Sequence, residues 1–261
     1  MDLKHCARLF SFLPAPMPFP FCPLPTNAEI YHTSPPRMNA TTLKRKLKSM
    51  QGSLPESHAI RLHRAISWLK AAEEQEKSPD LRLICLWVSV NSLYAMDEAR
   101  FEQLPERERF GDFVDRLLAC DGESRLYNIL WNKFTGPVRL LIENKYVYAP
   151  FWDHQRGEAR NWEAGFQRSI ADANNALSKK NVAYLLRIVL DRLYVLRNQL
   201  IHGGATYKSQ VNRAQVRDGA NLLSALLPVM IELIMVMGRK IGGGSISRWW
   251  GRIIIKCIII S

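Results

Sequence analysis

The sequence lacks several features that would place it in well-known classes of protein. No segment shows sustained alternation of apolar and polar residues, so we predict no β-sheet. The five cysteines are scattered, and no two have zinc-finger or C-x-x-C spacing, so we predict neither a disulfide framework nor a metal site. The motifs H-E-x-x-H and G-x-S-x-G, a phosphate-binding loop and a dinucleotide-binding glycine motif are also missing, so no cofactor is predicted.

The positive charge of the chain is concentrated at its ends. The net charge of +12 over 261 residues divides into +4 for residues 1–56, +2 for 57–202 and +6 for 203–261. Solvated basic ends explain such an excess, so the charge permits binding to RNA without indicating it. A hydrophobic content of 47% with 23% charged residues is typical of a soluble globular protein.

The two terminal segments lack helical periodicity. Residues 1–37 contain 8 of the 14 prolines, which interrupt every apolar stretch, so we expect no signal peptide. The isoleucine-rich run 253–260 is too short to span a bilayer. It is interpreted either as an amphipathic tail on a membrane surface or as an end of the chain with no selected function. We favour a soluble, cytoplasmic protein with no membrane partner.

The rest of the chain has the periodicity of helices. We predict a disordered, Pro-rich and basic leader over 1–52, a helical domain over 53–240 and an irregular Gly- and Ile-rich tail over 241–261. Ser53 and Glu56 have the spacing of a capping box, which predicts a helix start. Further helices are expected over 81–96 (after the start signal 78–80), 106–119, 124–134, 137–147, 181–202 and 209–238, with a less regular region over 149–178. Apolar residues spaced three and four apart predict a packing side on each of the last two helices: Val182, Leu186, Val189, Leu193, Leu196 and Leu200 in 181–202, and Val216, Ala220, Leu223, Leu227, Met230 and Ile234 in 209–238. The fold class is all-α, a helical bundle with long antiparallel helices.

Some side chains in these segments have two interpretations. His58 and His63 are expected on an exposed side of their helix. The aromatic residues Trp152, Trp162 and Phe166 either anchor the region 149–178 to the core or offer platforms for stacking bases.

The most informative stretch runs from Arg197 to His202 and is followed by Gly203 and Gly204. It places a permanent cation, an amide and an imidazole at the expected end of a helix. Cleavage of a phosphodiester without a metal needs a fixed positive charge and a group that moves protons near neutral pH. The alternative is a capped helix end, because histidine interacts favourably with the helix dipole and glycine is the usual stop.

Helix geometry separates the two main groups of this motif. Arg197 and His202 are five residues apart, so they point about 140° away from each other, whereas Asn198 and His202 differ by only about 40°. Arg197 and His202 can converge on one phosphate if the helix loosens at Gly203, or if a second subunit brings its own copy. The second route favours a composite site at the interface of a symmetric dimer.

Two segments together resemble the HEPN superfamily, most closely its Apea-like bacterial branch. One is Trp-Val-Ser-Val-Asn-Ser-Leu-Tyr-Ala over 87–95, on the apolar helix. The other is Leu-Arg-Asn-Gln-Leu-Ile-His-Gly-Gly over 196–204. The resemblance covers roughly residues 57–238. It implies a helical bundle, usually dimeric, found in toxin–antitoxin, phage-defence and RNA-processing systems, and in many members a metal-independent endoribonuclease.

The same resemblance implies roles for individual residues. Arg197 and His202 match the catalytic pair of the family, and Asn198 matches the polar residue that commonly follows the arginine. Asn91 occupies the place of a supporting polar residue on the second helix. From the residues alone, Asn91 is interpreted as a core amide hydrogen-bonded to a neighbouring backbone group.

Two functions therefore stay open at the level of sequence. The first is an endoribonuclease that acts through the 2′-hydroxyl of RNA, with His202 moving the proton and Arg197 stabilising the charge on the phosphate. The second is a non-catalytic module for binding RNA or nucleotide, or for dimerisation, in a toxin–antitoxin or defence system. The expected partners are RNA, a second copy of the chain and an antitoxin protein.

Overall fold

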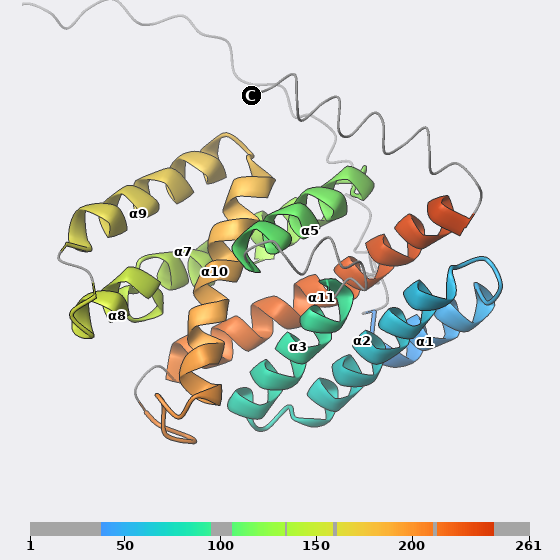
Figure 1. Cartoon of the computed structure of the whole chain (residues 1–261), viewed down its shortest axis with the longest axis horizontal. Coiled ribbons are helices and arrows are strands. Elements are labelled where there is room, and N and C mark those ends of the chain that lie inside the picture. The colour runs from blue at the N-terminus through green and yellow to red at the C-terminus, as the bar shows by residue number, and fades with distance from the viewer. Residues whose placement is uncertain (1–37, 95–105, 134, 159–160, 211–212, 243–261) are drawn as a thin grey trace, which may run out of the picture. The chain divides into compact units, whose positions relative to one another are not determined.

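The computed structural model describes residues 38–94, 106–133, 135–158, 161–210 and 213–242. All regular elements in these ranges are helices, which confirms the predicted all-α fold (Figure 1). The Pro-rich residues 1–37 and most of the predicted tail, 243–261, lie outside the described residues.

The longest helix, α11 (Arg213–Gly242), is the centre of the core. It packs against α3 (Pro79–Tyr94) and α2 (Glu56–Glu74), and α2 and α3 pack on each other over most of their length (Figure 1). The apolar side predicted for α11 is confirmed, since its members are all buried: Val216, Ala220, Leu223, Leu227, Met230 and Ile234. By length and hydropathy α11 could cross a membrane, but 72% of its most apolar window is buried, as in the core helix of a soluble protein.

A second long helix, α10 (Val182–Ile201), crosses α11 (Figure 1). The crossing point is Gly219, where an added Cβ would lie only 2.8 Å from Cδ2 of Leu193. A side chain at this position would therefore force Leu193 to shift, which shows how closely α10 and α11 pack here. The predicted apolar seam of α10 is buried at Leu186, Val189, Leu193 and Leu196, whereas Val182 and Leu200 at its two ends are half-buried. α10 also packs on α5 (Glu106–Cys120), α7 (Thr135–Ile142) and α9 (Glu163–Ser178).

Between α5 and α10 the chain is divided into shorter elements than the sequence predicts. The region 124–134 forms α6 (Arg125–Asn128) and a π-helical turn, η1 (Ile129–Lys133). The helix expected over 137–147 ends at Ile142 as α7, and a 3₁₀ turn, η2 (Lys145–Val147), follows. The region 149–178, predicted to be less regular, contains two regular helices, α8 (Ala149–Gln155) and α9.

The first helix, α1 (Ala40–Ser49), corrects the predicted domain boundary. The leader assigned to 1–52 is wrong over these residues, because α1 packs on α2 and α11 and its Leu43 is fully buried. The basic composition of 44–48 hid this helix, since its apolar side is narrow and depends on the core for burial. The capping box is also wrong: α2 begins after Pro55, and the Ser53 hydroxyl donates to the carbonyl of Met50.

His58 departs from the exposed position expected for it. It is half-buried on α2 against Gly238 of α11, where an added Cβ would lie 3.2 Å from His58 Cδ2. Burial, with a smaller contribution from the charge of Arg61, lowers the pKa of His58 to about 4. His63 is exposed, as predicted.

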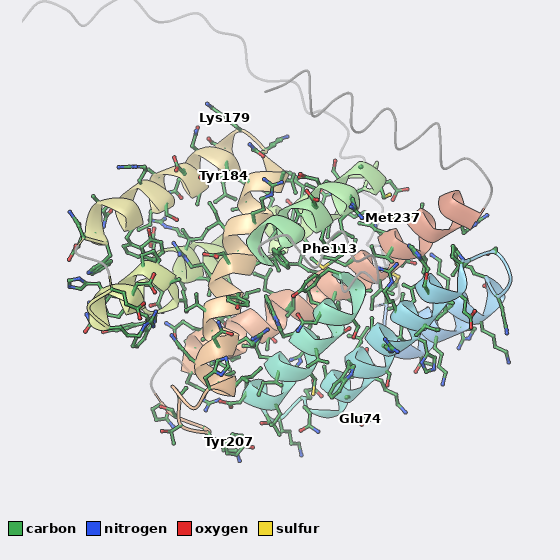
Figure 2. The ribbon with its side chains drawn as sticks, in the orientation of Figure 1. Glu74, Phe113, Lys179, Tyr184, Tyr207 and Met237 are labelled. Atoms are coloured by element: carbon green, nitrogen blue, oxygen red, sulfur yellow. The ribbon has the colours of Figure 1, made fainter. Side chains whose placement is uncertain are left out.

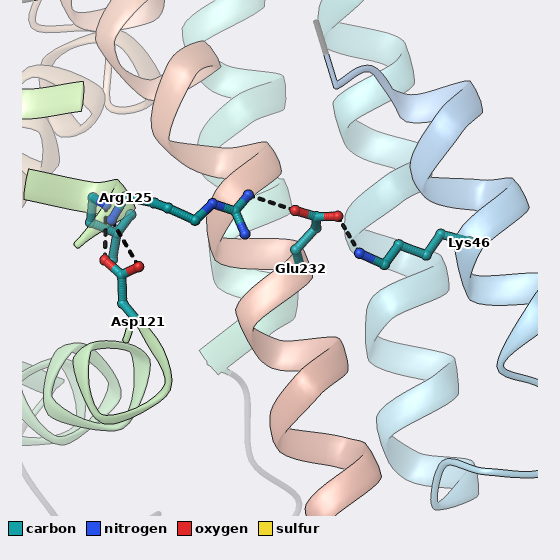
Figure 3. Close-up of polar contacts among 5 residues, drawn as sticks. Lys46, Asp121, Arg125 and Glu232 are labelled. Atoms are coloured by element: carbon teal, nitrogen blue, oxygen red, sulfur yellow. Dashed lines mark hydrogen bonds and ion pairs between the residues drawn. The ribbon is translucent and has the colours of Figure 1, made fainter. Parts of the chain in front are cut away.

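A buried carboxylate ties three helices together (Figure 3). Glu232 of α11 pairs with Lys46 of α1 and, at 2.5 Å, with Arg125 of α6. Asp121 in turn accepts the backbone N–H groups of Arg125 and Leu126, both at 2.9 Å, and so caps α6. Burial by itself would raise the pKa of Glu232, but the hydrogen bonds and charges of its two cationic partners outweigh burial and hold that pKa below its ordinary value.

Truncating Leu43 tests whether α1 belongs to the fold. We expect Leu43→Ala to lower the free energy of unfolding by about 2–5 kcal/mol, because it removes a fully buried side chain. Chemical denaturation of the full chain measures this change. Lys44→Ala, at an exposed neighbouring position, is the control and should change stability by less than about 0.5 kcal/mol. Equal effects of the two substitutions would mean that α1 is not part of the cooperative unit.

Replacing Glu232 tests the ionic contact between helices. Glu232→Gln should lower stability near neutral pH by on the order of 1–3 kcal/mol, because two charge-assisted hydrogen bonds are weakened. A lowered pKa in the folded state stabilises the protein above the ordinary glutamate pKa and loses this effect as the pH falls through the folded value. The stability difference between parent and variant should therefore shrink below about pH 4. A difference that stays constant down to acid pH would contradict this account.

Candidate functional site

Helix α10 ends just before Gly203, where the sequence predicts a helix stop. The helix stays regular to Ile201, and the His202 backbone N–H still donates to the Asn198 carbonyl at 2.9 Å. Gly203 then adopts φ of +72°, the left-handed region that side chains with a Cβ disfavour. The Ala205 N–H turns back to the Gln199 carbonyl at 2.9 Å. The capped-end interpretation is therefore confirmed for Gly203, and the loosening of the helix at this point is not present.

Arg197 faces α3. The carbon at the centre of its guanidinium lies 5.5 Å from the ring centroid of Trp87 and 5.0 Å from that of Tyr194. Its Nη1 donates to Oδ1 of Asn198 at 2.7 Å. Its Nε is buried and has no hydrogen-bond partner among the described residues, whereas Nη2 is not among the buried unpartnered atoms. The rings of Trp87 and Tyr194 and the side chain of Asn198 therefore hold the guanidinium in place.

His202 is exposed at the end of α10. A side-chain hydrogen bond joins Arg197 to Asn198, and a backbone hydrogen bond joins Asn198 to His202. In the described part of the chain, no hydrogen bond or ion pair joins the side chains of Arg197 and His202, as their separation around a regular helix requires. A single chain therefore presents the predicted catalytic pair on two different sides of one helix.

Asn91 lies on α3, one helical turn beyond Trp87. The two neighbouring polar residues of this mostly apolar helix bond to backbone carbonyls. The Ser89 hydroxyl donates to the carbonyl of Ala65 at 2.6 Å, and the Ser92 hydroxyl donates to that of Val88 at 2.9 Å. Asn91 differs, because its Oδ1 is buried without a hydrogen-bond partner among the described residues, as is Nε1 of Trp87. The backbone-bonded amide expected from the sequence is therefore not seen at Oδ1. Because residues four apart share a helix face, Asn91 lies on the side of α3 that carries Trp87, which Arg197 contacts.

The other side of the α10 terminus meets a segment that the sequence did not single out. Nε2 of Gln199 donates to the backbone carbonyl of Tyr146 at 2.6 Å, and Nε1 of Trp152 donates to the same carbonyl at 2.8 Å. One carbonyl of η2 therefore fixes both the end of α10 and the start of α8. The only sequence signal was that Gln199 stands three residues before His202, on the same side of the helix.

The aromatic residues of 149–178 form a cluster around a buried arginine. Arg192 of α10 is almost fully buried, donates to the Ser169 hydroxyl at 2.9 Å and lies 4.4 Å from the ring centroid of Tyr148. Phe166 is buried beside it, and Trp162 contacts Phe151 edge to face at 5.0 Å between centroids. The core interpretation is confirmed for Phe166, whereas Trp152 and Trp162 are half-buried.

Comparisons with known proteins add no identification. No family model matches the chain, and neither the curated proteins nor the solved structures give a match. Among the described residues, no group of three or more His, Cys, Asp and Glu side chains gathers in a way that could hold a metal ion. The resemblance to HEPN proteins therefore rests on the two motif segments themselves.

Proposed function

We propose that the chain is a metal-independent endoribonuclease of HEPN type, acting in the cytoplasm in a toxin, defence or RNA-processing role and controlled by an antitoxin partner. The observation that carries this proposal is the exposed imidazole of His202 at a helix end whose preceding turn holds Asn198 and the Arg197 guanidinium. These groups supply proton transfer, ribose or imidazole orientation and fixed positive charge.

The chemistry follows from the RNA itself. The 2′-oxygen attacks the adjacent phosphorus, and the bond from phosphorus to the 5′-oxygen breaks, which leaves a 2′,3′-cyclic phosphate and a 5′-hydroxyl. His202 either removes the proton of the 2′-hydroxyl while water protonates the departing 5′-oxygen, or protonates that oxygen while water takes the proton of the 2′-hydroxyl. Because the guanidinium remains charged at all relevant pH values, Arg197 stabilises the negative charge that grows on the phosphate oxygens.

A dimer resolves the geometric conflict within one chain. Arg197 and His202 lie on different sides of a regular helix end, so both reach one phosphate when Arg197 comes from one protomer and His202 from its partner. The bond between Nη1 of Arg197 and Asn198 fixes the arginine for that purpose. A homodimer is therefore part of the proposed function.

One observation favours the second candidate, a non-catalytic module for RNA or nucleotide binding or dimerisation. The contacts of Arg197 with the rings of Trp87 and Tyr194, and its buried Nε, are what an arginine with a purely structural role would show. The two candidates differ in whether RNA is cleaved, so activity decides between them.

His202→Ala tests the proposed activity. In chelator, with labelled single-stranded RNA, the parent chain should cleave and the variant should lose about 100-fold or more in rate, the usual contribution of a general acid or base. His63→Ala is the matched control, because His63 is also exposed but lies on α2. Cleavage by His202→Ala at the parent rate would exclude this mechanism. Absence of cleavage by the parent, together with RNA binding, would favour the non-catalytic module.

Mixing two inactive variants tests the composite site. Arg197→Met keeps an apolar contact with the neighbouring rings but removes the charge, and His202→Ala removes the imidazole. After unfolding and refolding together, each mixed dimer would contain one intact pair of Arg197 and His202. About a quarter of the parent activity should then return, because half of the dimers are mixed and each has one of two sites. If the mixture is as inactive as the separate variants, the pair does not act across an interface.

A further inference from the structure

The side of the α10 terminus that carries Gln199 is built against the turn η2. Gln199 and His202 are three residues apart, which corresponds to about 4.5 Å along the helix and about 60° around it. The hydrogen bond of 2.6 Å from Gln199 to the Tyr146 carbonyl therefore places η2 on the side of α10 that His202 continues at the helix end. Trp152 donates to this carbonyl as well, so the turn is held from two elements.

Two side chains of η2 combine an aromatic surface with a positive charge. Tyr146 is 43% exposed, although Phe151 supports its ring edge to face, with 5.5 Å between the centroids. The Lys145 ammonium lies over this ring, 5.3 Å from its centroid, and 5.6 Å from the centroid of Phe151. An exposed ring with a cation beside it matches the needs of a nucleotide, whose base stacks on aromatic rings and whose phosphate attracts a lysine.

The ion pairs near η2 join carboxylates to arginines and leave the Lys145 ammonium able to bind a phosphate. Glu143 is paired with Arg139 at 2.8 Å, and Arg156 pairs with Asp153 at 2.5 Å and with Glu158 at 3.1 Å. In the ranges that the structure describes, no carboxylate forms an ion pair with Lys145. An approaching phosphate would therefore not have to displace an acidic partner of this lysine.

We propose that Tyr146 and Lys145 form a nucleotide subsite on the His202 side of the α10 end that takes an unpaired base of single-stranded RNA on the tyrosine ring and an adjacent phosphate on the lysine. This inference rests on the proposed function and names its substrate class. Tyr146 can stack only on a base that is free of its partner strand, so the subsite selects single-stranded over duplex RNA. The subsite lies in one chain and does not need the dimer.

Binding of an uncleavable RNA tests the subsite apart from catalysis. The probe is a fluorescein-labelled single strand of roughly twelve nucleotides with 2′-O-methyl riboses, which lack the attacking hydroxyl, and anisotropy is measured with the full chain in chelator. Tyr146→Ala should weaken binding about tenfold through loss of stacking, and Tyr146→Phe should restore it, because the ring returns. Both variants keep the backbone carbonyl that holds Gln199 and Trp152.

Matched controls lie at the far end of α10 (Figure 2). Tyr184→Ala removes a tyrosine of similar exposure from the first turn of α10, and should leave the affinity unchanged. Lys145→Ala should weaken binding and reduce the slope of log affinity against log salt by about 0.7, the value for one phosphate contact on a single strand. Lys179→Ala, at an exposed lysine near Tyr184, should leave that slope unchanged.

The outcomes separate this inference from the proposed activity. Loss of affinity in Tyr146→Ala but not in Tyr146→Phe or Tyr184→Ala supports the subsite, even if His202→Ala cleaves RNA like the parent and the proposed mechanism fails. Unchanged affinity in Tyr146→Ala overturns the subsite, even if cleavage depends on His202. An equal loss of affinity for single-stranded and duplex RNA in Tyr146→Ala would also overturn it, because stacking on an unpaired base could not be the cause.

Discussion

Burial of α11 is the constraint on which the rest of the structure depends. Its apolar residues pack against α2 and α3 on one part of the helix and approach α10 at Gly219 on another. Each large apolar side chain buried in this way contributes about 1.5–3 kcal/mol, so α11, which packs against α2, α3, α5 and α7, supplies a large share of the packing energy of the domain. The ionic contacts of Glu232 are possible in this setting because Lys46 and Arg125 approach it from the two sides of the helix.

The position of α10 on this core determines what the end of α10 can do. Packing of its seam turns Arg197 toward Trp87 on α3 and Gln199 toward the carbonyl of Tyr146 on η2. His202 follows at the exposed end, on the Gln199 side. A cation held by rings and an imidazole in solvent thus occupy two sides of one helix terminus. This arrangement agrees with either a site shared between protomers or a structural role for Arg197, and it packs the turn η2, with its exposed Tyr146, against Gln199 of the last helical turn.

Much of the fold follows from local patterns in the sequence. The apolar sides of α10 and α11 were predicted because residues three and four apart share a helix face. All the predicted residues of α11 and the central four of α10 are buried. The start of α3 and the stop at Gly203 were also predictable, since both depend on the backbone preferences of a few adjacent residues. By contrast, α1 was missed because most of its residues are polar or charged and its apolar side is short. Its Leu43 becomes buried only where α1 packs on α2 and α11.

The sequence by itself determined where most helices run, which sides of them are apolar and that a cation, an amide and an imidazole stand at one helix end. These properties depend on neighbours within a turn or two, and the period of the helix makes them readable. Only the tertiary structure decided that Trp87 and Tyr194 hold Arg197, that Arg192 is buried beside Tyr148 and that Gln199 binds the carbonyl of Tyr146. Most of these contacts join residues far apart in the chain, and their geometry is set by how whole helices pack rather than by any local pattern.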